Sequence, residues 1–397
     1  MTVLTSLPAV VGLDAPVPVR DGFTGYANFD YAASAPCLQA VADAVAQALP
    51  YYSSVHRGAG YASQVTTRAY EDARETVREF LGGPQSVIFT RNTTDAFNLL
   101  ARAVPQGTSV VVFTSEHHAT QLPWRRAVRL PIPASPAEAL TAAENALRAC
   151  PEGPRLLVVT AASNVTGELW PIRELADVAH RCGARIAIDA AQLAPHRPFD
   201  AAPYDYVALS GHKLYAPFGA GVLAGRADWL RAADPYLRGG GATRSVTAEG
   251  AVAWAADPEQ RHEAGTPNVL GAIAIAAACR ALTDWHGIVA EEERLLARLR
   301  DGLAALPGVR ELSLWGPGHP RVGIVSFTVD GHSARSVAEY LSDVHGIGVR
   351  DGKFCAHPLV ATLTSSPETT ALRASLGLGT TDEHVDRLLT ALSTLPA

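Results

Sequence analysis

Residues 206–213 read YVALSGHK, and this stretch sets the fold that we expect for the rest of the chain. Its first four residues form a short apolar run typical of a buried strand, and polar residues follow at once. Lys213 closes the stretch, and it is one of only two lysines among 33 basic residues, the other being Lys353. Arginine stays protonated in proteins, whereas a lysine can lose its proton and form a Schiff base. The stretch therefore predicts a buried strand that ends beside a reactive amine.

Length and composition exclude several classes of protein. The chain has 397 residues, is 48% hydrophobic and carries a net charge of −6, without a basic run that would bind nucleic acid. No positive charge precedes Arg20, and the longest apolar run, 269–279, is too short to cross a bilayer. We therefore expect neither a secretory signal nor a membrane span. The five cysteines are scattered without metal-ligand spacing, which favours free thiols in the cytoplasm and predicts no metal site.

Apolar runs alternate with helical patterns through the first two thirds of the chain. This alternation predicts an α/β domain with a mainly parallel sheet covered by helices on both faces. The predicted strands are 87–90, 110–113, 156–159, 185–188, 206–209 and 219–224, and helices are expected at 67–81, 93–104 and 171–182. After about residue 285 the pattern changes to α+β. We expect a large domain at 26–280, a smaller C-terminal domain at 281–397, and an N-terminal segment, 1–25, that packs on the smaller domain.

Polar residues follow five of the predicted strands. Parallel strands present their carboxyl ends at one edge of a sheet, where ligands bind in doubly wound folds. These residues include hydroxyls, histidines, an amide, a carboxylate and the amine: Thr93, Thr94, His117, His118, Asn164, Asp189, Gln192, Ser210, His212 and Lys213. Any one of these residues alone is weak evidence for a site, because polar residues also cap helices that follow strands. Together they predict a functional site.

This set of side chains suits pyridoxal 5′-phosphate (PLP). Lys213 offers the amine that this cofactor needs, and Asp189 offers a carboxylate for its pyridine nitrogen. Thr93, Thr94, Ser210 and His212 fit a phosphate site at a helix N-terminus, and His118 could stack on the ring. No nucleotide-binding glycine motif follows a strand, which argues against a nucleotide ligand.

The chain also resembles a known family: the class V, fold type I PLP enzymes, and within them the SufS-type (group II) cysteine desulfurases. The resemblance rests on motifs spread over nearly the whole length. They are NFDYAA at 28–33, VHRG at 55–58, FTRNTT at 89–94, EHHA at 116–119, SNV at 163–165, DAAQ at 189–192, SGHKLY at 210–215, GGG at 239–241, EAGTPN at 263–268, RDGKFCA at 350–356 and RASL at 373–376. The SGHK and EAGTPN motifs are specific for the superfamily, and RDGKFCA points to a desulfurase of the short-loop group.

The resemblance implies a reaction and a role for each matching residue. L-Cysteine would become L-alanine, and its sulfur would pass to Cys355 as a persulfide. Arg373 would bind the substrate carboxylate, and Asn164, Ala33 and Arg350 would complete the substrate site. The cofactor would be held by Lys213, with Asp189, Gln192, Asn164, His118, Thr93, Thr94, Ser210 and His212 around it. Thr266 would reach the phosphate of a neighbouring subunit in a homodimer, and a SufE- or SufU-like protein would accept the sulfur.

Two departures from the family pattern leave alternatives open. Phe354 stands where a histidine usually precedes the nucleophile, although Lys353 could favour a thiolate there. Residues 377–379 are Gly-Leu-Gly, where an aromatic-Asn pair is common, and this predicts a more open pocket. The alternatives are a carbon–sulfur lyase acting on a modified cysteine, a selenocysteine lyase, an epimerase or an aminotransferase. Cys355 separates them, because only persulfide formation requires it. A scaffold without activity is the third possibility, and Lys213 with Asp189 argues against it.

Overall fold

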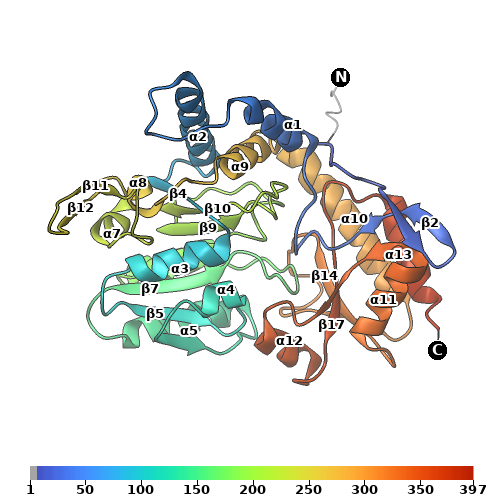
Figure 1. Cartoon of the computed structure of the whole chain (residues 1–397). Coiled ribbons are helices and arrows are strands. Elements are labelled where there is room, and N and C mark those ends of the chain that lie inside the picture. The colour runs from blue at the N-terminus through green and yellow to red at the C-terminus, as the bar shows by residue number, and fades with distance from the viewer. Residues whose placement is uncertain (1–6, 397) are drawn as a thin grey trace.

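The computed structural model describes residues 7–396 and shows a large and a small lobe side by side (Figure 1). The large lobe is built on a seven-stranded sheet with the order β4-β10-β9-β8-β7-β5-β6. Its strands are β4 (Ser86–Thr90), β5 (Ser109–Phe113), β6 (Ala127–Leu130), β7 (Arg155–Thr160), β8 (Arg185–Asp189), β9 (Tyr206–Ser210) and β10 (Gly221–Gly225). Neighbouring strands from β9 through β6 are parallel, and β10 alone runs antiparallel to both its neighbours. The predicted α/β class with a mainly parallel sheet is confirmed.

Helices cover both faces of this sheet because its central strands are apolar on both sides. In β7, Leu156 and Val158 pack into one core, while Leu157 and Val159 pack into the other. The helices of the large lobe are α1 (Gln39–Ala48), η1 (Leu49–Tyr51), α2 (Tyr61–Phe80), α3 (Thr93–Ala103), α4 (His118–Gln121), α5 (Pro136–Ala149), α6 (Ile172–Arg181), α7 (Ala227–Ala232), α8 (Pro258–His262) and α9 (Val269–Ala281). A two-stranded hairpin, β11 (Thr243–Val246) and β12 (Val252–Trp254), projects beside α7.

The small lobe has a core of its own. Its four-stranded antiparallel sheet has the order β13-β14-β17-β16. The elements are α10 (Trp285–Ala305), β13 (Val309–Leu312), β14 (Ile324–Val329), α11 (Ala334–His345), β15 (Ile347–Gly348), β16 (Arg350–Gly352), α12 (His357–Thr364), β17 (Ala371–Ser375) and α13 (Asp382–Ser393). Within residues 7–396 no single helix is long and apolar enough to span a membrane, although α9 and α10, bent by 85°, pass that test of length and composition as a pair.

The N-terminal residues contribute to the small lobe. A hairpin of β1 (Pro16–Val19) and β2 (Gly22–Gly25) lies against α11, and β3 (Ala27–Asn28) pairs in parallel with β15. Ala27 and Phe29 are fully buried among the side chains of α10, α11 and α13. The chain then passes to the large lobe, so residues 26–33 connect the two cores. Residues 1–6 of the predicted N-terminal segment lie outside the described part of the chain.

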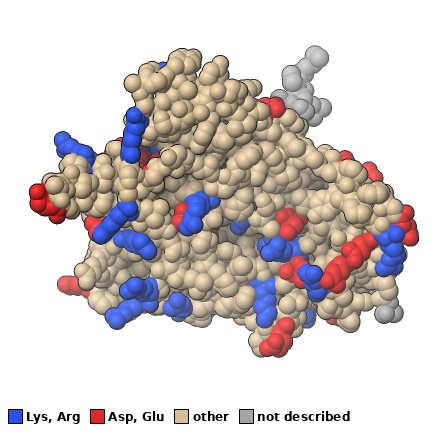
Figure 2. Space-filling view, viewed as in Figure 1, with Lys and Arg blue, Asp and Glu red and all other residues tan. Residues whose placement is uncertain are grey.

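One edge of the large sheet, β4, is covered by carboxylates instead of another strand. Glu259 accepts a hydrogen bond from the Val87 N–H at 3.0 Å, and Glu263 accepts one from the Phe89 N–H at 2.7 Å. These two residues, one in the first turn of α8 and the other at its C-terminal cap, meet alternate N–H groups of the strand. Arg74 from α2 holds Glu263 through two hydrogen bonds of 2.7 and 2.8 Å. The edge of β4 and the loop after α8 are thereby fixed to each other. On the face of the molecule seen in Figure 2, charged side chains of both signs are scattered over the surface.

Candidate active site

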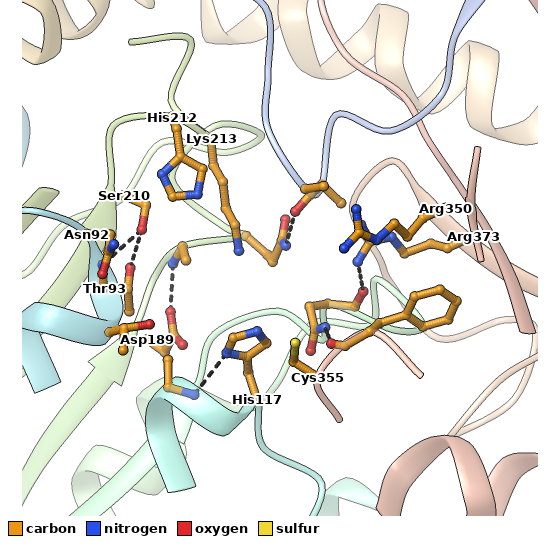
Figure 3. Close-up of a pocket in the computed structure, with 18 residues that line it drawn as sticks. Asn92, Thr93, His117, Asp189, Ser210, His212, Lys213, Arg350, Cys355 and Arg373 are labelled. Carbon is orange, nitrogen blue, oxygen red and sulfur yellow. Dashed lines mark hydrogen bonds between the residues drawn. The ribbon is translucent and has the colours of Figure 1, made fainter. Parts of the chain in front are cut away.

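The carboxyl ends of five strands meet at one cavity of about 300 Å³ between the two lobes (Figure 3). Polar residues after β4, β5, β7, β8 and β9 line it together with residues of the small lobe. The lining residues are Ala32, Ala33, Asn92, Thr93, Thr94, His117, Ala119, Asn164, Asp189, Ala191, Gln192, Ser210, His212, Lys213, Arg350, Phe354, Cys355 and Arg373. Of the fourteen residues predicted from the sequence for this site, the structure brings twelve together here and leaves out His118 and Thr266.

The N-terminus of α3 forms one end of the cavity. Asn92 caps this helix by accepting a hydrogen bond from the Asp95 N–H at 3.0 Å. The Thr93 N–H donates to Ser210 Oγ at 2.9 Å, and the two hydroxyl groups lie 2.8 Å apart. A β-carbon at Gly221 would stand 2.5 Å from Asn92 Cα, so only glycine lets β10 approach the cap this closely. Free N–H groups and hydroxyls at a helix N-terminus suit an anion such as a phosphate.

Lys213 and Asp189 lie in the middle of the cavity, where the Asp189 side chain is buried and that of Lys213 is half-buried. Burial lowers the pKa of Lys213 to about 8, and the nearby Asp189 charge opposes that fall. Burial also raises the pKa of Asp189, while Lys213 and two hydrogen bonds favour its charged form. Those bonds come from Thr120 Oγ1 at 2.8 Å and from the Ala191 N–H at 3.0 Å. The site thus holds a carboxylate in a fixed orientation and an amine that loses its proton readily.

His117, and not the predicted His118, faces the cavity. His117 is the N-cap of α4, and its Nδ1 accepts a hydrogen bond from the Ala119 N–H at 3.0 Å, which turns the ring inward. Burial lowers the pKa of His117 to about 3, with a further contribution from Lys213, so the ring is neutral. His118 points away, and its ring lies edge-on to that of His357 with centroids 4.7 Å apart. The backbone at the start of α4 determines which of the two adjacent histidine rings points into the cavity. The sequence alone does not show this.

Arg373 lies at the small-lobe side of the cavity, with its side chain 4% exposed. Its Nη1 donates to the Asn164 carbonyl at 3.0 Å, and its Nη2 donates to Asp30 Oδ1 at 3.2 Å. Its guanidinium carbon lies 5.1 Å from the centre of the Phe354 ring. Arg350, also on the cavity wall, has its Nη1 3.7 Å from Asp30 Oδ2. Sequence analysis missed Asp30 as a site residue. It lies within the quoted NFDYAA motif, but nothing else in the sequence distinguishes it from other aspartates.

Cys355 is exposed and lies on a short strained loop at the mouth of the cavity. Phe354 and Cys355 have φ angles of 52° and 54°, a left-handed conformation that is uncommon for residues other than glycine. Two hydrogen bonds hold the loop: Asn164 Nδ2 donates to the Phe354 carbonyl at 2.7 Å, and the His118 N–H donates to the Cys355 carbonyl at 2.9 Å. His118 therefore supports the cysteine loop through its backbone.

The two departures from the family pattern have structural explanations. The Phe354 ring is buried in an apolar cluster with Val165 and Leu359, so this side chain packs against the small lobe instead of serving the thiol. Lys353 donates to the Pro367 carbonyl at 2.5 Å. Near 377–379, the Tyr31 ring takes the space that side chains would need, since a β-carbon at Gly377 would lie 2.2 Å from it. The expected opening of the pocket is therefore filled by Tyr31.

Thr266 lies in a separate cavity of about 220 Å³, with His56, Arg57 and Gly241 on its wall. Within one chain it does not contribute to the main cavity. Gln192 does, and its Nε2 donates to the Ala32 carbonyl at 2.8 Å. Its Oε1 is buried and has no hydrogen-bond partner among the described residues, so it remains available to a ligand.

The main cavity has the groups that PLP requires. It offers an amine of lowered pKa, a buried carboxylate, a neutral imidazole on the wall, a helix N-terminus with hydroxyls and an unpaired amide oxygen. In residues 7–396 no group of three or more His, Cys, Asp and Glu side chains could hold a metal ion. Lys213, Asp189, His117, Thr93 and Ser210 would hold the cofactor.

Comparison with known proteins agrees with this fit. The model of the aminotransferase class-V family matches residues 27–388. A cysteine desulfurase of Dickeya dadantii is 36% identical over 384 residues, covering 92% of this chain and 91% of the relative. One from Haloferax volcanii is 35% identical over 408 residues, covering 96% and 92%. The solved cysteine desulfurase of Thermococcus onnurineus superposes with a TM-score of 0.83 at 31% identity, covering 93% of this chain and 94% of that one. For CsdA of Escherichia coli the TM-score is 0.80 at 32% identity, covering 92% and 94%.

The chain thus belongs to the aminotransferase class-V family of fold type I PLP enzymes. Within that family its similar relatives are the cysteine desulfurases, as the sequence motifs predict.

Proposed function

We propose that this protein is a PLP-dependent cysteine desulfurase, which converts L-cysteine to L-alanine and takes the sulfur onto Cys355 as a persulfide. The observation that carries this proposal is the position of Cys355. Its exposed thiol lines the same cavity as the Lys213 amine, whose pKa burial lowers. A lyase or an aminotransferase would need the amine and the carboxylate but not a thiol at the cavity mouth. The names of the relatives agree with this reading.

Bound PLP supplies an electron sink that stabilises negative charge on the substrate carbon. The side chains of the protein bind the cofactor and the substrate and transfer protons. Asp189 would supply the carboxylate that favours a protonated pyridine nitrogen, and the neutral imidazole of His117 would contact the cofactor ring. Arg373 binds the substrate carboxylate through charge-assisted hydrogen bonds, beside Asn164. Lys213, whose pKa is about 8, holds the cofactor and then moves protons as a free amine.

The thiolate of Cys355 would attack the substrate sulfur. The new bond joins the two sulfur atoms, and the carbon–sulfur bond of cysteine breaks, with its electron pair returning to the carbon. A proton delivered to that carbon completes L-alanine. The loop of Cys355 is held at both carbonyl groups flanking the thiol, by Asn164 and by His118. A loop held in this way cannot carry its thiol far from the cavity. We therefore propose that a SufE- or SufU-like acceptor protein binds beside the thiol in the cytoplasm.

We also propose that the active form is a homodimer. Thr266 lies outside the main cavity of its own chain, at a second cavity that another subunit could share. Large apolar side chains are exposed in the same lobe, among them Tyr61 (71%), Leu237 (56%) and Phe218 (44%). Light scattering on the purified protein should give twice the chain mass, and a fully active monomer would refute the dimer.

Replacement of Cys355 by serine tests the activity. The Cys355→Ser variant should bind PLP and L-cysteine as the wild type does, form no persulfide and release almost no alanine. Cys37→Ser, at a half-buried thiol that does not line the cavity, is the matched control and should leave turnover unchanged. Products are identified by mass spectrometry as alanine and sulfide, pyruvate, or an oxo acid. Alanine formed at the wild-type rate by Cys355→Ser would exclude the desulfurase and favour a lyase or an aminotransferase.

A further inference from the structure

Asp30 lies between the two guanidinium groups at the substrate end of the cavity. Its Oδ1 accepts from Arg373 Nη2 at 3.2 Å, and its Oδ2 lies 3.7 Å from Arg350 Nη1. The Arg373 side chain is 4% exposed and that of Asp30 is 25% exposed, so water screens their contact poorly. Burial raises the pKa of the Asp30 carboxyl group, and the two guanidinium groups oppose that rise because they favour its charged form. The carboxylate is therefore part of the site that receives the substrate, held between the two arginines.

The hydrogen bonds of Arg373 leave its Nε without a partner in the described part of the chain. Nη1 is held by the Asn164 carbonyl and Nη2 by Asp30. Nε is buried, and it has no hydrogen-bond partner among residues 7–396. A guanidinium group can bind a carboxylate through Nε and a neighbouring Nη nitrogen, and Nη2 has two N–H groups to share. Asp30 can thus stay in contact with Arg373 while a substrate carboxylate binds the edge that includes Nε.

The backbone around Asp30 is rigid. Its carbonyl accepts hydrogen bonds from the N–H groups of Ala33 at 3.0 Å and Ser34 at 3.3 Å. This turn places Ala32 and Ala33 on the cavity wall, and a β-bridge joins Asp30 to Ser375, two residues after Arg373. Asp30 cannot follow a ligand freely, so its charge keeps a fixed position relative to both arginines.

The charges at this end of the cavity therefore sum to +1, from Arg373, Arg350 and Asp30. One carboxylate neutralises that charge, whereas a second carboxylate would leave an excess negative charge in a poorly screened place. We propose that Asp30 is a specificity-determining residue that positions Arg373 and restricts the enzyme to amino acids with a single carboxylate. This inference rests on the proposed function, in which Arg373 binds the substrate carboxylate, and it names the substrate class more narrowly.

Binding of two amino acids to the PLP-loaded enzyme tests the proposal. L-Alanine has one carboxylate and L-aspartate has two, and the Kd of each is measured from the change in cofactor absorbance. The wild type should bind L-aspartate at least about tenfold more weakly than L-alanine. In Asp30→Asn the ratio of the two Kd values should fall by about tenfold, because the site then has a charge of +2. Asp386→Asn is the matched control, since Asp386 is an exposed carboxylate of the small lobe that pairs with Arg298, does not line the cavity and should leave the ratio unchanged.

The reverse charge change gives an independent measurement. Arg350 is 54% exposed, so Arg350→Gln should fold even if Asp30→Asn does not. It lowers the sum of charges to zero, and the Kd of L-alanine should rise by about tenfold. The double variant restores +1, and its Kd ratio should return to within about threefold of the wild-type ratio.

Two results would overturn the inference: a folded Asp30→Asn variant whose Kd ratio stays within about twofold of the wild type, or Arg350→Gln with an unchanged Kd for L-alanine. Failure of the proposed function looks different. A wild-type enzyme that prefers L-alanine to L-aspartate but releases no alanine from L-cysteine is not a desulfurase, and the Kd ratios of its variants still decide the role of Asp30.

Discussion

Covalent capture of PLP by the protein without cofactor should depend on pH through Lys213. Only the unprotonated amine attacks the aldehyde of the cofactor. Burial lowers the pKa of Lys213 from 10.5 to about 8, and Asp189 opposes this effect. The amine is the free base above its pKa and the cation below it. The capture rate should therefore rise with pH and level off above about 8.

The size of the effect follows from the two pKa values. At pH 7 an amine with a pKa of about 8 is unprotonated in about one molecule of ten. An amine with the ordinary value of 10.5 is unprotonated in about one of 3,000. Burial in this cavity therefore raises the reactive fraction roughly 300-fold at neutral pH. Asp189→Asn removes the charge that favours the cation, so the levelling point should move to a lower pH.

The assay mixes cofactor-free protein with PLP between about pH 5.5 and about pH 9.5 and follows the absorbance of the linked cofactor. Mixing the same PLP solutions with Nα-acetyl-lysine corrects for ionisation of PLP itself. Lys213→Ala is the control, because Lys353 is then the only lysine left in the chain. A rate that still rises about tenfold per pH unit above pH 8, as for an ordinary lysine, would refute the argument from burial.

Three further predictions concern other parts of the structure. His117→Ala should weaken PLP retention by about tenfold and change its absorption band, whereas His118→Ala should retain PLP normally; equal effects of both changes would contradict the assignment from the cavity wall. Arg373→Lys keeps the charge but loses the planar donor group, so KM for L-cysteine should rise by about tenfold or more, and an unchanged KM would mean that another residue binds the carboxylate. Glu263→Ala leaves Arg74 buried without its main partner and should cost about 3 kcal/mol of stability in urea unfolding, while Glu249→Ala at an exposed site should not move the midpoint.

The strand and helix pattern of the large lobe could be predicted because its signals are local. The runs at 110–113, 156–159, 185–188 and 206–209 are apolar on both faces, and each corresponds to a strand of the sheet. The sequence analysis missed β6, where Val128 and Arg129 are exposed at the sheet edge, and β17, whose ALRAS sequence includes a buried arginine. In both strands, exposed or charged residues interrupt the apolar run that marks a buried strand.

The site residues that lie at the carboxyl ends of strands could be predicted from the sequence. Lys213, Asp189 and Ser210 stand directly after or within strands, so topology alone brings them together. Thr120 and Asp30 act on other side chains and carry no signal of their own. His117 and His118 differ only in which ring the first turn of α4 directs inward. Sequence reasoning cannot resolve such choices, because they depend on one or two backbone angles.

The two carboxylates on β4 also have a consequence for the behaviour of the protein at high concentration. An open strand at the side of a sheet offers a row of N–H groups that can pair with a strand of another molecule and start aggregation. Glu259 and Glu263 occupy the outward N–H groups of Val87 and Phe89, so these two groups offer no free template to another strand. Burial and the neighbouring Asp257 raise the pKa of Glu259 to about 7, so mild acid would protonate this carboxylate and weaken its hydrogen bond to the Val87 N–H. Storage of the protein at low pH should therefore promote fibrous or amorphous association beginning at β4.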